Sequence, residues 1–327
     1  MATSTLPTES VKASRQALRV GIAFGLVYFF WGSTYLAIRI GVAQVPAALL
    51  TGVRFLTAGA LMLGWCALSG RKIALNRQDA LRIAIIGVLL LSGGNTLLAW
   101  TEFYIPSGLA ALIVAVVPIW IAIIEGVIPR GEKLTRAGWG GLLLGIAGLI
   151  VLLWPELTAH NTLGRPALIA CGVVLFGSLC WAAGSIVSRR SSLGVGPFTA
   201  AGWEMAIAGS LNLIFSLIVG DQHRAHWTRS SALAVAYLIV FGSWVGFTAY
   251  IWLLEHVPTP KVATYAYVNP IVAVFLGWLI GHERLDRYMF MGMVVIVSAV
   301  ALVTTSKLRS GSRQPAHSGV RCDTASD

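Results

Sequence analysis

Inside the long apolar segments of this chain, an arginine and a glutamate are the residues best suited to act on a charged solute or a proton. Arg54 and Glu204 occupy equivalent places in the two halves of the sequence. An ionisable side chain in a membrane span is costly and marks a solute pathway, a structural pair or a residue that reaches toward the interface. Both are candidate pathway residues. Glu204 is also the candidate for proton coupling, because burial favours the neutral form of a carboxyl group.

Two prolines deep in apolar segments are the next candidates for a pathway. Pro118 and Pro270 each follow another proline, Pro106 or Pro258, by twelve residues. A proline inside a helix removes a backbone donor and frees a carbonyl group, which lipid tolerates only against protein or a water-filled cavity. The alternative is a packing kink, but the matched pair favours a cavity. Further polar and aromatic candidates would suit an amphipathic metabolite: Trp31, Ser33, Asn95, Trp100, Trp181, Tyr265 and Asn269.

Sequence motifs for catalysis or metal binding are missing. The chain has no Gly-Lys dipeptide and hence no P-loop, all five aspartates fall outside the apolar runs, and the four cysteines form no Cys-x-x-Cys. We therefore expect no catalytic residue, no metal and no cofactor. Two alternatives to a carrier stay open: a lipid-handling protein or enzyme without a recognisable motif, and a passive channel, although channels usually assemble rings of identical groups.

The elements that must position these residues are membrane-spanning helices. Hydrophobic residues make up 57% of the chain, charged residues 11%, and the mean hydropathy is +0.78. A helix needs roughly 20 apolar residues to cross a bilayer. Ten segments qualify: Val20–Ile38, Pro46–Leu68, Ile83–Tyr104, Ser107–Ile128, Ala137–Trp154, Pro166–Val187, Phe198–Val219, Ala232–Leu254, Val262–Ile280 and Tyr288–Thr305.

The basic residues predict the orientation of these spans. Of the 24 lysines and arginines, 17 fall on the side of the N-terminus, six fall on the other side, and Arg54 lies within a span. Basic loops mark the cytoplasmic side, so both termini are predicted to be cytoplasmic. The net charge of +11 therefore needs no nucleic acid to explain it. The expected partners are membrane lipids and a small-molecule solute, and the expected functional unit is a monomer.

The two halves of the sequence resemble each other. The proline pair recurs at an offset of 152 residues, and Trp31 and Arg39 recur as Trp181 and Arg189 at an offset of 150. Because each copy has an odd number of helices, two copies in series must insert in opposite directions. The predicted fold is all-α, with ten transmembrane helices as two inverted five-helix repeats. The predicted parts are a cytoplasmic tail (1–19), a first repeat (20–154), a linker (155–165), a second repeat (166–305) and a disordered cytoplasmic tail (306–327).

Several strings resemble the drug/metabolite transporter superfamily, and specifically its ten-helix EamA-type members. They are Trp31-Gly-Ser-Thr-Tyr-Leu-Ala-Ile-Arg-Ile-Gly41, Gly52-Val-Arg-Phe55, Pro106-Ser-Gly-Leu-Ala-Ala111, and Tyr265-Ala-Tyr-Val-Asn-Pro270 followed by Glu283. The resemblance covers about residues 20 to 305. It implies a carrier of the bacterial inner membrane, usually an exporter of amino acids, other metabolites or drugs, that works by alternating access without ATP. It implies no particular substrate.

Overall fold

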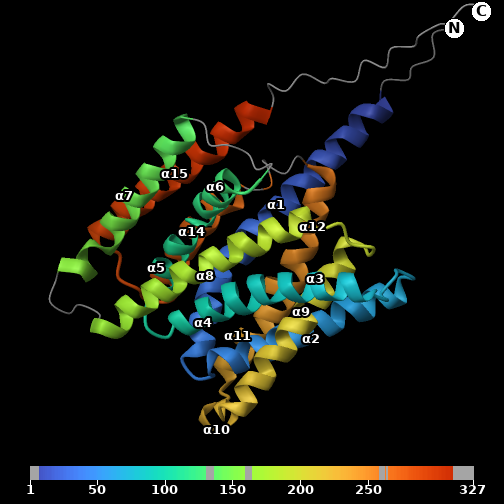
Figure 1. Ribbon diagram of the computed structural model, residues 1–327, viewed down its shortest axis with the longest axis horizontal. Helices are drawn as coiled ribbons and strands as arrows, with labels where there is room; N and C mark the ends of the chain where they lie inside the picture. The colour runs from blue at the N-terminus through green and yellow to red at the C-terminus, as the bar shows by residue number, and fades with distance from the viewer. Residues whose placement is uncertain (1–6, 130–135, 159–163, 258–261, 263, 312–327) are drawn as a thin grey trace, which may run out of the picture.

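The computed structural model describes residues 7–129, 136–158, 164–257, 262 and 264–311 of the chain. All regular elements in these ranges are helices, shown in Figure 1. Eight helical segments are long and apolar enough to cross a membrane, and the last two predicted spans correspond to the shorter apolar helices Val268–Leu279 and Arg287–Leu302. The predicted all-α membrane fold is therefore confirmed, with a helix count that is consistent with ten spans.

The first half contains five spans, two of which are interrupted. The elements are α1 (Pro7–Val42), α2 (Ala47–Leu68), α3 (Arg77–Gly87) with the π-helix η1 (Val88–Thr96) and α4 (Leu97–Thr101), α5 (Ser107–Val114) with α6 (Val117–Val127), and α7 (Arg136–Thr158). The interruption between α5 and α6 lies directly before Pro118, which takes one of the first positions of α6. A proline fits there because the backbone N–H of a first-turn residue has no partner within the helix.

The second half repeats this order. Its elements are α8 (Gly164–Arg190), α9 (Pro197–Ile218), the short α10 (Asp221–Arg224), α11 (Arg229–Tyr237) with the π-helix η2 (Leu238–Val245) and α12 (Gly246–His256), α14 (Tyr265–Leu279) and α15 (Arg287–Gly311). Pro270 lies inside α14. Helix α15 continues into the segment predicted to be a disordered tail, and α1 begins within the predicted N-terminal tail. Residues 1–6 and 312–327 of these tails lie outside the described residues.

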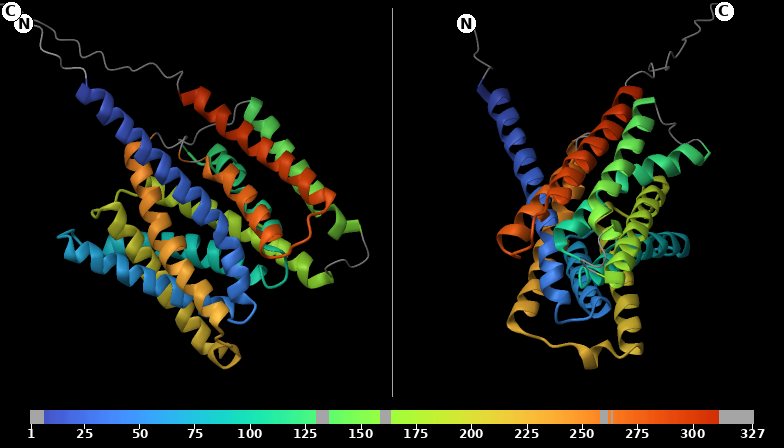
Figure 2. Two further views of the ribbon diagram at one scale, coloured as in Figure 1. Left: turned by 180° about the vertical axis from the view of Figure 1, so that it is seen from behind. Right: turned by 90° about the vertical axis from the view of Figure 1, so that its left-hand side faces the viewer.

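The packing relates the halves by an approximate two-fold symmetry. The second helices of the halves, α2 and α9, pack against each other, and so do the fifth helices, α7 and α15. The first helices of the halves, α1 and α8, have equivalent neighbours. Helix α1 packs on α14, and α8 packs on α5 and α6, so each contacts the fourth span of the other half. Likewise, α1 contacts η2 and α12 of the third span of the other half, and α8 contacts η1 and α4. In Figures 1 and 2 the α7–α15 pair lies on one side of the molecule, away from α2 and α9. The start of α1 and the end of α15 lie at the same end.

Glycines allow α2 and α9 to cross with their backbones in contact. A β-carbon at Gly59 would lie 2.5 Å from the amide nitrogen of Ala206, and one at Gly52 would lie 2.8 Å from the amide nitrogen of Leu213. Close approach of small residues is the usual way in which membrane helices associate, because lipid offers no hydrophobic driving force between them. Gly202 and Gly209 occupy the equivalent positions on α9, 150 residues after Gly52 and Gly59. The crossing therefore lies close to the two-fold axis.

Candidate functional site

The third span of each half contains a π-helix, and the two π-helices overlap under the internal symmetry. An offset of 152 residues relates Gly94 to Gly246. When this offset is applied, η2 (Leu238–Val245) corresponds to residues 86–93 of the first half, which overlap η1 (Val88–Thr96). π-helices are rare and occur frequently at functional sites. The sequence analysis did not predict them. The only local signal is the glycine and serine content of these segments, Ser92-Gly-Gly-Asn95 and Gly242-Ser243.

Arg54 on α2 joins these two π-helices. Its Nε donates to Ser243 Oγ on η2 at 3.0 Å, and its Nη1 donates to Asn95 Oδ1 on η1 at 3.3 Å. The side chain is 3% exposed, and its guanidinium lies 4.7 Å from the centre of the Phe55 ring. Arg54 therefore links the two halves at their centre, through one residue that the sequence analysis selected, Asn95, and one that it missed, Ser243.

A second group of hydrogen bonds lies beside Arg54. Asn212 Nδ2 on α9 donates to Thr96 Oγ1 at 2.8 Å, and Thr96 Oγ1 donates to Thr51 Oγ1 at 2.9 Å. All three side chains are buried or half-buried. Because Thr51 and Thr96 come from the first half and Asn212 from the second, this group also crosses the interface between the halves.

Trp31 and Trp181 occupy equivalent places, and each indole covers a glycine of the opposite half. A β-carbon at Gly246 would lie 2.5 Å from Trp31 Nε1, and one at Gly94 would lie 2.8 Å from Trp181 Cε3. Tyr265 interacts with both: its ring lies edge-on to Trp31 with a centroid separation of 5.2 Å, and its hydroxyl group interacts with Trp181. The structure thus brings three of the selected aromatic residues together.

The remaining polar candidates on α1 and α14 are buried. Ser33 shares a hydrogen bond of 2.6 Å with the hydroxyl of Tyr237 on α11. Asn269, directly before Pro270, is 7% exposed, and its Oδ1 has no hydrogen-bond partner among the described residues. The main-chain oxygen of Asn269 approaches Gly32 of α1, so this segment faces the interior. An unpaired buried amide oxygen is destabilising, and it is a place where a solute or water can donate.

Trp100 does not lie with the other candidates. Its side chain is 39% exposed, and its ring stacks obliquely on Tyr104 with a centroid separation of 4.9 Å. Phe103 and Tyr104 are also exposed. A cluster of exposed aromatic residues at the end of a span is typical of the belt that anchors a protein at the membrane interface.

Two buried glutamates differ in their surroundings. Glu204 is 8% exposed, and no ion pair between the described residues joins it to Arg54. Glu102 at the end of α4 is fully buried, and neither of its carboxylate oxygens has a hydrogen-bond partner among the described residues. Arg39, Arg54, Tyr35 and Glu283 interact with Glu102 electrostatically. The sequence analysis did not select Glu102.

Charged and polar groups tie the halves together at the end of the molecule where α1 ends. Glu283, in the turn before α15, accepts hydrogen bonds from the backbone N–H groups of Ser107 and Gly108 at 2.8 and 3.1 Å. It thereby caps the N-terminus of α5, where a carboxylate is favourable. Arg39 lies 3.5 Å from the same carboxylate and donates to the carbonyl oxygens of Glu102 and Ile105. We call Arg39, Ser107 and Glu283 the end cluster.

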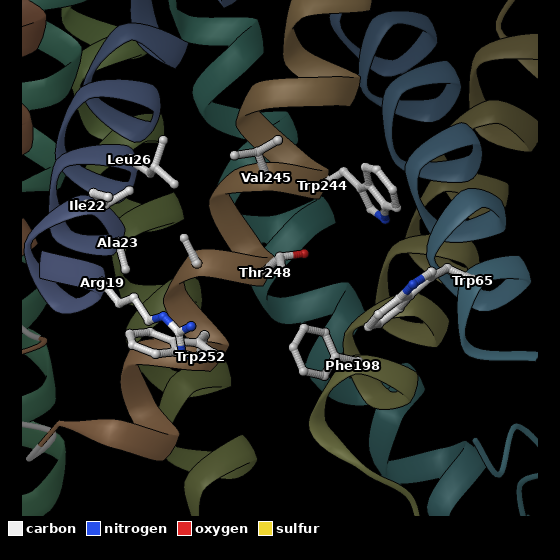
Figure 3. Close-up of a pocket in the computed structure, with 11 residues that line it drawn as sticks. Arg19, Ile22, Ala23, Leu26, Trp65, Phe198, Trp244, Val245, Thr248 and Trp252 are labelled. Carbon is white, nitrogen blue, oxygen red and sulfur yellow. The ribbon is translucent and has the colours of Figure 1, made fainter. Parts of the chain in front are cut away.

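A pocket of about 610 Å³ opens toward the opposite end of the bundle. Arg19, which lines it, precedes Arg39 by twenty residues on α1, or about 30 Å of helix. Figure 3 shows the walls, formed by α1, α2, α9 and the η2–α12 segment, and therefore by both halves. The lining residues are Arg19, Ile22, Ala23, Leu26, Trp65, Phe198, Trp244, Val245, Thr248, Ala249 and Trp252.

Fold and site together define the class of protein: a multi-pass membrane transporter built from two inverted halves around a central polar contact. It is not an enzyme. The chain belongs to the EamA-like transporter family, whose sequence pattern matches it twice, at residues 19–154 and 168–305. This finding confirms the family resemblance of the sequence.

Relatives of known name agree with this class. The inner membrane transporter YedA of Escherichia coli (strain K12) is 40% identical over 294 residues, which cover 90% of this chain and 93% of YedA. A protein of the same strain named "Probable amino-acid metabolite efflux pump" is 25% identical over 305 residues, which cover 86% of this chain and 93% of that protein. A solved crystal structure with 19% identity has a TM-score of 0.64 and covers 89% of this chain. At this identity the match supports the fold alone.

Proposed function

We propose that this transporter exports a small metabolite from the cytoplasm across the inner membrane of a bacterium by alternating access between its two halves. The observation that carries the proposal is the asymmetry between the two ends: a pocket walled by both halves opens toward one end, and the end cluster joins the halves at the other. Inverted repeats of this kind work by rocking one half against the other around a site near the midplane.

The side on which a solute would bind follows from the predicted orientation. The pocket lies toward the end that carries the start of α1, which the distribution of basic residues predicts to be cytoplasmic. A solute would enter there and reach the contact between Arg54, Asn95 and Ser243, since Ser243 directly precedes the pocket residue Trp244. The name of the E. coli efflux pump is in line with export.

Uptake and efflux measurements in proteoliposomes test the transport step. The purified chain is reconstituted in sealed vesicles and assayed for counterflow with amino acids, other metabolites and drugs, with and without a pH gradient. Saturable, protein-dependent exchange of at least one solute is expected. If every solute fails to exchange and the protein instead turns over or flips a phospholipid, the lipid-handling alternative replaces the carrier.

The accessibility of Thr248 to a labelling reagent tests whether the pocket is open to the cytoplasm and how the chain is oriented in the membrane. In a variant with its four native cysteines replaced, Thr248→Cys is expected to react with a membrane-impermeant maleimide in inside-out vesicles, because Thr248 lines the pocket. In right-side-out cells it is expected to react much more slowly. Gln222→Cys, at an exposed position of α10 near the end of α1, is the control for the other side and is expected to react in right-side-out cells. Labelling of Thr248→Cys from the outside alone would reverse the proposed orientation.

Glu204 is the residue proposed to couple transport to protons. Glu204→Gln keeps the shape of the side chain and fixes it in a neutral form, so its transport rate is expected to lose its dependence on pH. The pH profile of counterflow over about pH 5 to 8 measures this. Glu102→Gln is the comparison, because Glu102 is the other buried glutamate that forms no ion pair with the residues that the structure describes. An unchanged pH profile in Glu204→Gln removes Glu204 from the proton step.

A further inference from the structure

The pocket beside α1 has aromatic walls and a cation at one side. Of the eleven lining residues that the structure describes, four are aromatic (Trp65, Phe198, Trp244 and Trp252), one carries a hydroxyl group (Thr248), and one, Arg19, is charged. Figure 3 shows Arg19 on the α1 side of the pocket and Trp65 and Phe198 on the far side. A volume of about 610 Å³ is within the range of sites that enclose a small organic molecule.

A second cation lies against the same aromatic wall. The guanidinium of Arg71 lies 4.6 Å from the centre of the Trp65 ring and 4.8 Å from that of Phe198. The two rings meet edge to face with a centroid separation of 5.4 Å. These cation–π contacts fix the orientation of the rings, and they add positive charge on the side of the pocket opposite Arg19.

The arginines and aromatic rings of the pocket determine which ligand charge it binds best. A carboxylate, sulfonate or phosphate near Arg19 would gain a charge-assisted hydrogen bond, and its apolar body would lie against the tryptophans. A positively charged ammonium group would find no carboxylate among the lining residues that the structure describes. Ring faces can attract an ammonium group, but Arg71 already lies over the rings of Trp65 and Phe198. The charges of Arg19 and Arg71 also repel a cation, so the pocket disfavours cations and zwitterions relative to anions.

We infer that the pocket binds amphipathic organic monoanions, whose aromatic or aliphatic body lies between Trp252 and Trp65 and whose anionic group pairs with Arg19. This inference rests on the proposed function, since it names the substrate class of the entrance that the transporter would use. The same chemistry is present in a free organic acid and in an anionic lipid head group. The geometry favours the free acid, because the walls come from four helices of both halves.

Three probes with one phenylethyl body separate the head-group charges. They are 2-phenylethanesulfonate, phenylalanine and trimethyl(2-phenylethyl)ammonium, which are an anion, a zwitterion and a permanent cation, and all cross protein-free bilayers poorly. The full chain is reconstituted in phosphatidylcholine vesicles, and binding is measured by quenching of tryptophan fluorescence and transport by counterflow. The sulfonate is expected to bind at least about tenfold more tightly than the other two, since a hydrogen bond to a charged group accounts for such a difference.

Variants of Arg19 test whether the preference for the sulfonate arises in this pocket. Arg19→Gln is expected to weaken sulfonate binding about tenfold, and Arg19→Glu is expected to reverse the preference in favour of the ammonium probe. Arg15→Gln is the matched control, because Arg15 lies one turn earlier on α1, is exposed and does not line the pocket. Both arginines contribute to the basic cytoplasmic end, so an equal effect of the two changes would mean a general surface charge and would overturn the inference.

The outcomes also separate this inference from the proposed function. Transport of phenylalanine or of the cation at least as fast as that of the sulfonate would leave the transporter intact and overturn the anion preference. Arg19-dependent binding of the sulfonate without any counterflow would support the pocket chemistry and contradict the transport proposal. Loss of sulfonate binding on adding phosphatidylglycerol, together with Arg19-dependent binding of that lipid, would make an anionic lipid the occupant and overturn the inference.

Discussion

Replacing Gly59 with leucine is expected to destabilise the protein by about 3 kcal/mol and to reduce the amount of folded protein that can be extracted from membranes. The reason is contact between backbones: a β-carbon at this position would lie 2.5 Å from the amide nitrogen of Ala206 and 2.8 Å from the carbonyl oxygen of Gly202. Backbone atoms of a packed helix cannot turn aside as the end of a long side chain can, so α2 and α9 would have to separate.

Gly64→Leu is the matched control on the same helix. A β-carbon at Gly64 would meet nothing within 4 Å, and leucine is the better helix former by about 1 kcal/mol. This variant is therefore expected to be as stable as the parent protein or slightly more stable. Apparent melting temperature and the monodisperse fraction in detergent measure both variants. Equal stability of the two leucine variants would show that the glycine crossing does not hold the halves together.

Replacing Arg54 with glutamine is expected to slow transport at least tenfold while the protein stays folded. Arg54 donates to Ser243 in one half and to Asn95 in the other, at 3.0 and 3.3 Å. Hydrogen bonds from a charged donor contribute about 1.5 to 3 kcal/mol each, and 1.4 kcal/mol corresponds to a tenfold change in rate. The loss falls on the contact between the two π-helices, where the proposed alternating access would move the halves past each other.

Arg82→Gln provides the comparison for Arg54→Gln. Arg82 is an exposed arginine of α3 whose Nη1 donates to the carbonyl oxygen of Ser192 at 3.0 Å. Exposed contacts of this kind contribute little, so transport is expected to change less than about twofold. Arg54→Lys keeps the charge but not the fork of donors, and an intermediate rate is expected. Wild-type counterflow by a folded Arg54→Gln protein would exclude Arg54 from the pathway.

The fold was predictable because the signals that define it are long and repeated. The length of the apolar segments located the spans. The duplication was visible in the sequence because residues recur at a nearly constant offset, as Trp31 does at Trp181 and Pro118 at Pro270. The symmetry also paired Arg54 with Glu204, whereas Asn95 and Tyr265 were selected only for their polar and aromatic side chains. The two π-helices were missed because periodicity is weak where lipid and neighbouring helices are both apolar, so a local change in hydrogen bonding leaves no trace in hydropathy.

The individual contacts of the site were harder to predict. Ser243 was missed because a small hydroxyl residue in an apolar span has no distinctive pattern, and only its partner Arg54 reveals its role. Trp100 was selected for its depth along the chain, but which face of a helix a residue occupies depends on the neighbours of that helix. Glu283 was part of the family resemblance, yet its role as a cap for α5 depends on a turn 176 residues away from Ser107.

The π-helices have a further consequence for how each half can move. A π segment holds an extra residue, and one residue of α-helix corresponds to a rotation of about 100° and an advance of about 1.5 Å. Conversion of η1 to regular α-helix would therefore turn α4, with Glu102 at its end, about its own axis while α3 stays in place. The extra residue of the π-helix therefore allows the helix that follows it to rotate when the π-helix becomes α-helix. In the proposed cycle each half would thus re-aim the last part of its third helix, α4 or α12, without disturbing the glycine crossing of α2 and α9.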